Sequence, residues 1–598
     1  MFTVNTEAIP KATFPLTGSR DWMTAIATSR DPKSKDHIMK TDGAHLVVEA
    51  LKLNGVSTIY GLVGIPITDL VRLAQAEGIR FLGFRHESAA GHAASAAGFL
   101  TGRPGICMTV SGPGFLNGLV ALANSTANCF PMIQIAGSSD RAVVDLSRGD
   151  YEELDQLAIA KTLAKAAYRV DRAADIGLAV ARAIRTATSG RPGGVYLDIP
   201  ATVLSEVVDI ETCRAALRRV VDPAPRQYPS DIAVERAVTL LAGAQRPLIV
   251  LGKGAAYARA DDEIRRFIES TGLPFLPMSM AKGLLPDDHS QSVAAARSLA
   301  MRQADVVMLV GARLNWLLGH GEAPQWNADA RFIQVEIDPT ELDSNQTIAA
   351  PLLGDIASVM EVLNRAAAGV STPRAWRESL TAKVVENKEK MAKRLAAETH
   401  VDTDPMGYYP ALRAVRDVLA EHPDVYLVNE GANTLDYTRN VVDMHRPRHR
   451  LDCGTWGVMG IGLGYAVAAA VESGAPVVAI EGDSAFGFSG MEMETICRYQ
   501  LPVTVVVFNN GGIYRGDDTN PVSSDPAPTQ LLHSTRYDRL AESFGATGYL
   551  VATATELESA LRTAIASGRP ALIDCVIDPA DGTESGHLTN LNPAVGRN

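Results

Sequence analysis

The chain has 598 residues, of which 46% are hydrophobic and 21% charged, and this composition excludes collagen, coiled coil and extensive disorder. Its 56 basic and 68 acidic residues give a net charge of −12 without a basic run, so nucleic acid is not an expected partner. The six cysteines are scattered and form no CxxC pair, which favours reduced thiols in a cytoplasmic protein.

Residues 1–40 are predicted to be an N-terminal extension, since they lack the apolar core of a secretory signal. No apolar run approaches the roughly 20 residues that a membrane-spanning helix needs. We therefore expect a cytoplasmic protein that does not contact the membrane.

Three blocks of alternating apolar and helical runs follow along the chain. This alternation predicts an α/β fold with three doubly wound parallel-sheet domains, at 41–215, 230–368 and 400–578. A tail at 579–598 completes the chain, and the linkers are the proline-rich run 222–229 and the charged run 378–398. Strands are expected at 58–62, 81–85, 106–110 and 132–136, at 247–251, 305–310 and 332–337, and at 425–428, 476–480 and 502–508.

Two polar clusters in the third block each follow an expected strand. The first is 482–485 (GDSA) and the second is 509–512 (NNGG). The carboxyl ends of neighbouring parallel strands form the crevice in which open α/β sheets bind ligands. Asp483, Asn510 and the carbonyl of Gly512 are hard oxygen donors suited to Mg²⁺, and the small residues let a diphosphate approach the backbone. Each cluster alone would be interpreted as an ordinary turn.

Together the clusters resemble the signature of thiamine diphosphate-dependent enzymes, a GD(G/S) turn followed further along by NN. Ser484 stands where glycine is commoner in that family. The resemblance implies thiamine diphosphate and Mg²⁺, and it also requires a carboxylate beside the aminopyrimidine of the cofactor. Glu87, which follows the strand at 81–85 and opens an alanine-rich helix, meets this requirement.

Alternative interpretations exist for each motif taken alone. Glu87 could simply complement the dipole of its helix, and His86, Glu87 and His92 do not have the spacing of an HExxH zinc motif. Met459, in the glycine-rich run 454–462, is expected to support the folded cofactor but could be a core residue.

Further motifs resemble the oxalyl-CoA decarboxylase family, and matching runs extend over nearly the whole chain after about residue 41. They are 60–66, 149–155, 429–433, 482–491, 509–516 and 584–587. The resemblance implies a pyrimidine-binding, a Rossmann-like middle and a diphosphate-binding domain. It implies the non-oxidative decarboxylation of oxalyl-CoA to formyl-CoA and CO₂. It further implies a homotetramer, as a dimer of dimers, in which Glu87 of one subunit meets the Asp483 domain of another.

The resemblance also implies the residues of each site. Catalytic residues are Glu87, Tyr151, Glu152, Tyr514 and Ser585, and metal ligands are Asp483, Asn510 and Gly512. Cofactor contacts are Glu87, Tyr408, Ala432, Asn433, Thr434, Gly457, Val458, Met459, Gly482, Asp483, Ser484, Ala485, Asn510 and Tyr514. Substrate contacts are Ile65, Tyr151, Asn387, Arg439, Asn440, Ser585, Gly586 and His587, the last of which is Arg in some relatives. The last three lie in the tail 579–598, which the resemblance implies closes over the substrate.

In the middle domain the resemblance implies ADP as an activator, with FAD as the alternative. The contacts would be Arg191, Lys253, Arg313, Glu336, Asp355 and Ile356. Independently, Glu336 at a strand end can bind ribose hydroxyls, and Lys253 and Arg313 follow strands where they can reach phosphates. For the whole chain, the alternatives are a 2-hydroxyacyl-CoA lyase and a non-catalytic nucleotide-binding paralogue.

Overall fold

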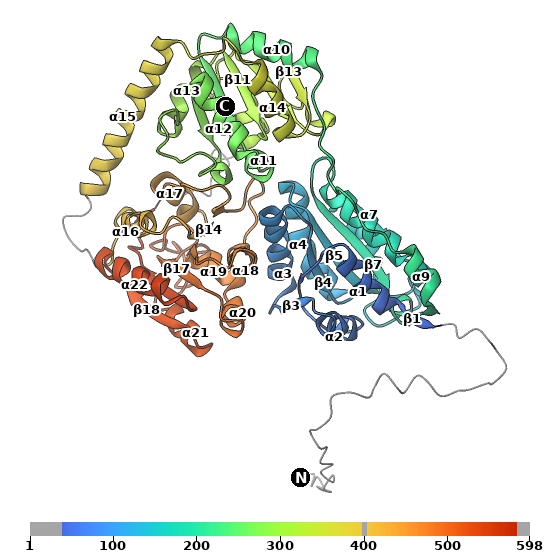
Figure 1. The fold of residues 1–598 in the computed structure, drawn as a ribbon. Coiled ribbons are helices and arrows are strands. Elements are labelled where there is room, and N and C mark those ends of the chain that lie inside the picture. Colours follow the sequence, from blue (N-terminus) through green and yellow to red (C-terminus); the bar gives the residue numbers. More distant parts are fainter. Residues whose placement is uncertain (1–38, 398–403, 583–598) are drawn as a thin grey trace, which may run out of the picture.

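The computed structural model describes residues 39–397 and 404–582, and it contains three parallel sheets that helices cover (Figure 1). The predicted α/β class is therefore confirmed. Each range expected for a domain contains one parallel sheet. In the described part of the chain, no helix is both long and apolar enough to span a membrane.

The first domain has the strand order β3-β2-β4-β5-β7-β6. Its strands are β2 Thr58–Gly61, β3 Arg80–Gly83, β4 Gly105–Thr109, β5 Met132–Ser138, β6 Ala166–Arg169 and β7 Gly194–Pro200. A separate antiparallel pair is formed by β1 Lys40–Asp42 and β8 Val207–Asp209. The helices of the first domain are α1 Gly43–Leu53, α2 Thr68–Ala76, α3 Glu87–Thr101, α4 Pro113–Asn128, α5 Arg141–Val144, α6 Gln156–Ala160, α7 Ile176–Thr188, α8 Ala201–Ser205 and α9 Ile210–Ala216.

The middle domain has five strands in the order β10-β9-β11-β12-β13. They are β9 Pro247–Leu251, β10 Phe275–Pro277, β11 Val306–Val310, β12 Arg331–Glu336 and β13 Ile348–Leu353. The helices are α10 Asp231–Ala242, α11 Lys253–Tyr257, α12 Asp261–Thr271, α13 Arg297–Gln303 and α14 Ile356–Ala366. The charged run expected as a linker is the long helix α15 Arg374–Ala397, which leads to the third domain (Figure 1).

The third domain has the strand order β15-β14-β16-β17-β19-β18. The strands are β14 Tyr426–Glu430, β15 Arg450–Leu451, β16 Val477–Gly482, β17 Val503–Asn509, β18 Thr547–Val551 and β19 Ala571–Val576. The helices are α16 Tyr408–Ala420, α17 Asn433–Val441, α18 Gly462–Ser473, α19 Asp483–Ser489, α20 Glu492–Arg498, α21 Tyr537–Ser543 and α22 Ala554–Ser567.

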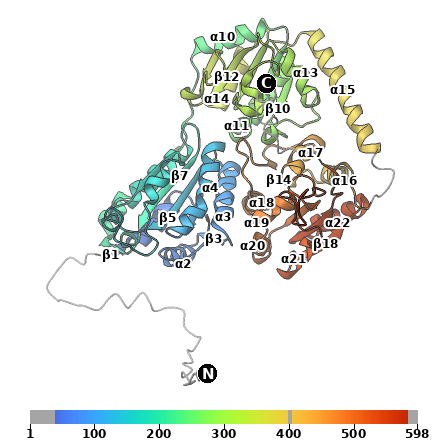
Figure 2. The same ribbon diagram turned by 180° about the vertical axis from the view of Figure 1, so that it is seen from behind.

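Helices α3 and α18 join the first and third domains, and both views show them side by side (Figures 1 and 2). Both helices are rich in alanine and glycine, which lets their backbones approach closely. A Cβ on Gly464 would lie 2.6 Å from the carbonyl oxygen of Ala89. Around this contact, Asn124 Nδ2 donates to the Tyr465 hydroxyl at 3.0 Å. The two domains therefore share one continuous core.

His92 lies fully buried in this shared core, with its ring 6.1 Å from that of Tyr465. Neither ring nitrogen has a hydrogen-bond partner among the described residues. Burial lowers the pKa of His92 to about 3, because a protonated ring would have to be desolvated without a counter-charge.

We expect His92 to make the contact between the two domains sensitive to acid. The unfolded chain takes up this proton near pH 6.5, whereas the folded chain does not. The stability is therefore complete above that pH and is lost as pH falls, by about 2 kcal/mol between pH 7 and pH 5. Denaturant unfolding of the parent and His92→Gln at both pH values measures this. An equal pH dependence in the two proteins would contradict the prediction.

Candidate active site

The two predicted polar clusters meet at the carboxyl ends of neighbouring strands. Strands β14, β16 and β17 are adjacent and parallel, so that Asn433, Asp483 and Asn510 follow three strand ends at the same edge of the sheet. Asp483 and Asn510 are each 2% exposed. This is the edge at which α/β sheets bind ligands.

Backbone amides orient the buried carboxylate of Asp483. Gly511 N donates to Oδ2 at 2.8 Å, and Ser484 N donates to Oδ1 at 2.7 Å. Burial raises the pKa of Asp483 to about 6, although these backbone hydrogen bonds and one from Gly512 oppose the shift. A bound cation would remove the cost of holding this charge in the interior.

The side-chain amides of Asn433 and Asn510 converge on the carbonyl oxygen of Tyr514. Their Nδ2 atoms donate to it at 2.9 and 2.8 Å respectively. The oxygen of the Asn510 amide then has no hydrogen-bond partner among the described residues, so it is available as a ligand. No cluster of three His, Cys, Asp or Glu side chains suited to a metal occurs in the described part of the chain. A metal here therefore needs further oxygens from its ligand, which fits a Mg²⁺–diphosphate pair.

The remaining predicted cofactor contacts surround this edge. Ala432, Asn433 and Thr434 lie at the start of α17, whereas Gly482, Ser484 and Ala485 lie at the start of α19. Gly431 has φ +117°, and a Cβ there would lie 2.1 Å from Thr434 Oγ1, so only glycine fits. Tyr408 opens α16 and stacks on Tyr437 with ring centroids 5.2 Å apart.

The glycine-rich loop that carries Gly457, Val458 and Met459 lies partly exposed before α18. Buried Glu430 holds its end, because its carboxylate accepts from Gly460 N and, at 2.6 Å, from Gly462 N. Burial raises the pKa of Glu430 to about 7.

Thr455, near the start of this loop, is where the three domains meet. Its backbone N and hydroxyl donate to Asn128 Oδ1 at 2.9 and 3.0 Å, and Lys253 Nζ donates to its hydroxyl at 2.8 Å. Trp316 Nε1 donates to its carbonyl at 3.0 Å. Burial lowers the pKa of Lys253 to about 7.

Glu87 is the first residue of α3 and is only 6% exposed. Asn117 Nδ2 donates to its Oε2 at 3.0 Å. No hydrogen bond or ion pair among the described residues joins Glu87 to Asp483 or Asn510. The third domain nevertheless reaches the residue next to Glu87, since His86 N donates to Glu492 Oε1 at 3.0 Å.

The loops at the carboxyl end of the first sheet, the end at which Glu87 lies, also carry Ile65, Tyr151 and Glu152. Ile65 and Tyr151 are 69% and 67% exposed. Ser111 Oγ donates to Glu152 Oε2 at 2.6 Å, and the Glu152 carboxylate raises the pKa of the neighbouring Tyr151 hydroxyl by accepting its hydrogen bond.

A cleft of about 460 Å³ lies between the middle and third domains, and Asn433, Arg439, Lys253 and Arg313 are among its lining residues. A second cavity of about 610 Å³ shares Arg439 with it. The second cavity also contains Asn440 and three cations that the sequence did not reveal: Lys282, Arg297 and Arg302.

One predicted substrate residue, Asn387, lies elsewhere. Asn387 on α15 donates to the carbonyl of Ala295 at 2.6 Å, next to the wall of the second cavity but outside its lining. Ser585, Gly586 and His587 lie outside the described residues.

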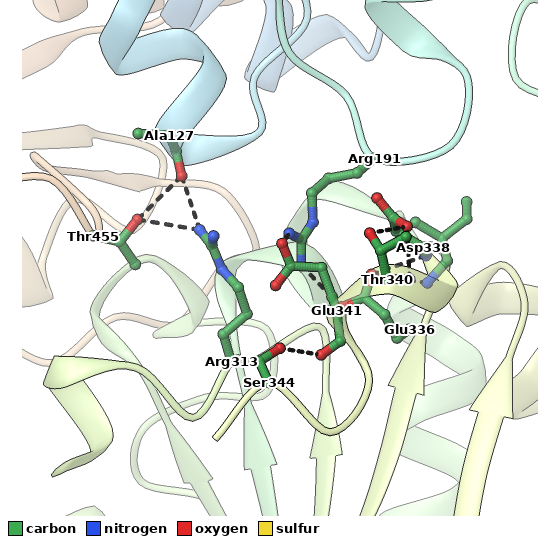
Figure 3. Close-up of polar contacts among 10 residues, drawn as sticks. Ala127, Arg191, Arg313, Glu336, Asp338, Thr340, Glu341, Ser344 and Thr455 are labelled. Atoms are coloured by element: carbon green, nitrogen blue, oxygen red, sulfur yellow. Dashed lines mark hydrogen bonds and ion pairs between the residues drawn. The ribbon is translucent and has the colours of Figure 1, made fainter. Parts of the chain in front are cut away.

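All six residues predicted to bind ADP line one further cavity of about 140 Å³. They are Arg191, Lys253, Arg313, Glu336, Asp355 and Ile356. Arg191 forms ion pairs with Glu336, at 3.1 Å, and with Glu341, while Arg313 donates to the carbonyl of Ala127 at 2.8 Å (Figure 3). Lys253 and Arg313 also line the 460 Å³ cleft, so the two cavities share a wall.

Sequence reasoning missed the residues that join these sites. Asn128, Thr455 and Ser111 bear ordinary side chains in no motif of their own, and their partners come from distant parts of the chain. The one signal that could have found two of them is the small residues beside Ser111 and Thr455, in the runs 111–114 and 454–462.

Comparison with known proteins identifies the family. The N-terminal TPP binding domain of thiamine pyrophosphate enzymes matches residues 41–159, the central domain 234–363 and the C-terminal TPP binding domain 431–575. The chain belongs to the thiamine pyrophosphate enzymes.

Named relatives are similar over almost the whole chain. Oxalyl-CoA decarboxylase of Escherichia coli (strain K12) is 60% identical over 561 residues, which cover 93% of this chain and 99% of that protein. The 2-hydroxyacyl-CoA lyase of Oryza sativa subsp. japonica is 46% identical, covering 93% of this chain and 98% of its own. Human 2-hydroxyacyl-CoA lyase 1 is 40% identical, covering 90% and 95%.

Proposed function

We propose that this chain is a carbon–carbon lyase that decarboxylates oxalyl-CoA, without oxidation, to formyl-CoA and CO₂. The observation that carries the proposal is the 60% identity to an oxalyl-CoA decarboxylase over 93% of the chain. The relatives that are 2-hydroxyacyl-CoA lyases are less similar, at 46% and 40%.

Thiamine diphosphate, when bound, supplies the nucleophilic carbon and the electron sink that loss of CO₂ requires. We propose that Asp483, Asn510 and the Gly512 carbonyl hold it through Mg²⁺, and that the starts of α17 and α19 receive its diphosphate. The buried, amide-oriented carboxylate of Asp483 supports this assignment. Glu87 would hold a proton at the aminopyrimidine, and Met459 would support that ring.

The exposed side chains around both halves of the site support a shared site between subunits. Leu116 and Val120 accompany Ile65 and Tyr151 in the first domain. Trp456, Phe488, Met491 and Ile513 are likewise exposed in the third domain. We propose a homotetramer, as a dimer of dimers, in which Glu87 of one subunit faces the Asp483 cluster of another.

We also propose that the enzyme is cytoplasmic and that its three domains span residues 41–215, 230–368 and 400–578.

The thioester would enter through the two cavities that share Arg439. Arg297 and Arg302 give the larger cavity the charge that a phosphate-bearing carrier such as coenzyme A needs, whereas Lys282 is paired with Asp287 at 2.9 Å. The oxalyl end would lie beside Ile65, Tyr151 and Glu152, and we propose Ser585, Gly586 and His587, which lie outside the described residues, as further substrate contacts.

Mass analysis of the products tests the proposal. Purified protein is incubated with Mg²⁺, thiamine diphosphate and either oxalyl-CoA or a long-chain 2-hydroxyacyl-CoA, with and without ADP. We expect formyl-CoA and CO₂ from oxalyl-CoA. If only the 2-hydroxyacyl thioester is turned over, the protein is a 2-hydroxyacyl-CoA lyase. If neither thioester is turned over, the result favours a non-catalytic nucleotide-binding paralogue.

Tyr514 follows the metal loop and is expected near the reacting carbon. Replacing it by Phe leaves its backbone carbonyl, and therefore the bonds from Asn433 and Asn510, in place. We expect Tyr514→Phe to bind thiamine diphosphate with unchanged affinity and to lower kcat about ten-fold or more, because the hydroxyl no longer orders a proton donor. Calorimetric titration and steady-state kinetics measure the two quantities, and loss of cofactor affinity would contradict the assignment.

We propose ADP as the ligand of the 140 Å³ cavity, where buried Glu336 would accept hydrogen bonds from the ribose hydroxyls. We expect Glu336→Ala to weaken ADP binding about ten-fold, as the loss of one hydrogen bond to a charged group does. Calorimetry with ADP checks this, with Glu361→Ala on the surface of α14 as the control. Unchanged affinity in Glu336→Ala would exclude this role.

A further inference from the structure

The turn between β4 and α4, residues 110–112, and the first turn of α4 lie between the two carboxylates that we assign to catalysis. On one side, a Cβ on Gly114 would lie 3.1 Å from Glu87 Oε1. On the other side, Gly112 has φ +46°, and a Cβ there would lie 2.8 Å from the Cβ of Glu152. These residues therefore pack against both glutamates.

Ser111 provides the polar contact of this turn with Glu152. It is 5% exposed, and its hydroxyl donates to Glu152 Oε2 at 2.6 Å. Its alternative acceptor, the carbonyl of Ile65, is 3.5 Å away, so the short bond to the carboxylate is the better one. The bond thus joins a buried hydroxyl to a loop whose neighbouring side chain, Tyr151, is largely exposed.

The backbone of Glu152 needs such an anchor. Its φ is +56°, in the left-handed region that non-glycine residues rarely adopt. A short hydrogen bond to a charged oxygen is strong enough to hold the carboxylate in one orientation in this loop.

We propose that Ser111 is a positioning residue that aims the Glu152 carboxylate at the substrate end of the site. The inference rests on the proposed function, because it assumes that Glu152 takes part in the decarboxylation. Ser111 itself touches neither substrate nor cofactor and acts only through Glu152.

The test is a double-mutant cycle in the full-length enzyme with oxalyl-CoA, using Ser111→Ala, Glu152→Gln and the double variant. We expect Ser111→Ala to lower kcat about ten-fold or more, the usual effect of losing a hydrogen bond to a charged group, while KM changes less than three-fold. The double variant should have the same kcat as Glu152→Gln alone, because Ser111 acts only through Glu152.

Two more variants separate positioning from folding. Ser111→Thr keeps the hydroxyl and should retain kcat within about three-fold. Ser125→Ala removes another buried hydroxyl of the same domain, one that donates to a backbone carbonyl at 2.6 Å, and should leave kcat unchanged.

Additive effects of Ser111→Ala and Glu152→Gln, or equal losses in Ser111→Ala and Ser111→Thr, would overturn the inference. An unchanged kcat in either Ser111→Ala or Glu152→Gln would overturn it as well. Failure of the proposed function is distinguishable, because the parent chain would then produce no formyl-CoA.

Discussion

Replacing Glu87 by Gln is expected to lower turnover of oxalyl-CoA by a factor of about 10² to 10⁴, the usual contribution of one positioned acid or base. The amide has the same shape but cannot take and return a proton at the aminopyrimidine. Asn117 can still contact the amide oxygen, so the fold should be retained. Steady-state kinetics at saturating cofactor measure the loss.

Two controls accompany this measurement. Circular dichroism and cofactor titration should match those of the parent, since only one atom has changed. Glu77→Gln, at a surface glutamate of the same domain that pairs with Lys52, should leave kcat unchanged. Unchanged turnover in Glu87→Gln would refute the assignment of Glu87 to catalysis.

Asp483→Ala is expected to abolish retention of the cofactor. The variant loses the only carboxylate of the proposed metal site, and with it the charge that Mg²⁺ neutralises. We expect the dissociation constant for thiamine diphosphate in Mg²⁺ to rise at least about a hundred-fold, as loss of a strong interaction with a charged group does. Equilibrium dialysis followed by assay of the bound cofactor measures this.

The metal-free variant should remain folded. Because burial raises the pKa of Asp483 to about 6, its ionised form in the folded chain is unfavourable at pH 8. Removing this carboxyl relieves that cost, so we expect the metal-free variant to unfold at a midpoint no lower than that of the metal-free parent at this pH. Asp417→Ala, at a partly exposed carboxyl on α16, serves as the control and should bind the cofactor normally. Normal retention by Asp483→Ala would contradict the metal site.

Most of the central strands of the three sheets could be predicted because they are buried, almost continuous apolar runs, as in β9 and β17. The edge strands β6, β10, β13, β15 and β18 were missed, since they are short or only partly buried. Central β7 and β19 were also missed, because Tyr196 and Asp198 interrupt the apolar run of β7 and Asp574 interrupts that of β19. Asp198 is buried only because it pairs with Arg169 on β6 at 2.7 Å, a contact that sequence does not reveal.

The same contrast holds for the candidate site. Asp483 and Asn510 could be placed at one sheet edge because each follows a recognisable strand, and parallel strands end together. The cations Lys282, Arg297 and Arg302 could not, since only the arrangement of the middle and third domains brings them to Arg439. Surface positions such as Tyr151 were identified by family resemblance alone.

The bonds at Thr455 have a consequence for motion. Asn128, Lys253 and Trp316 fix this residue from two other domains, and Met459 follows only four residues later. If the middle domain rotated as a rigid body, these bonds would break or the loop would travel with it. A displacement of the middle domain from this arrangement would thus be transmitted to the loop that carries Met459.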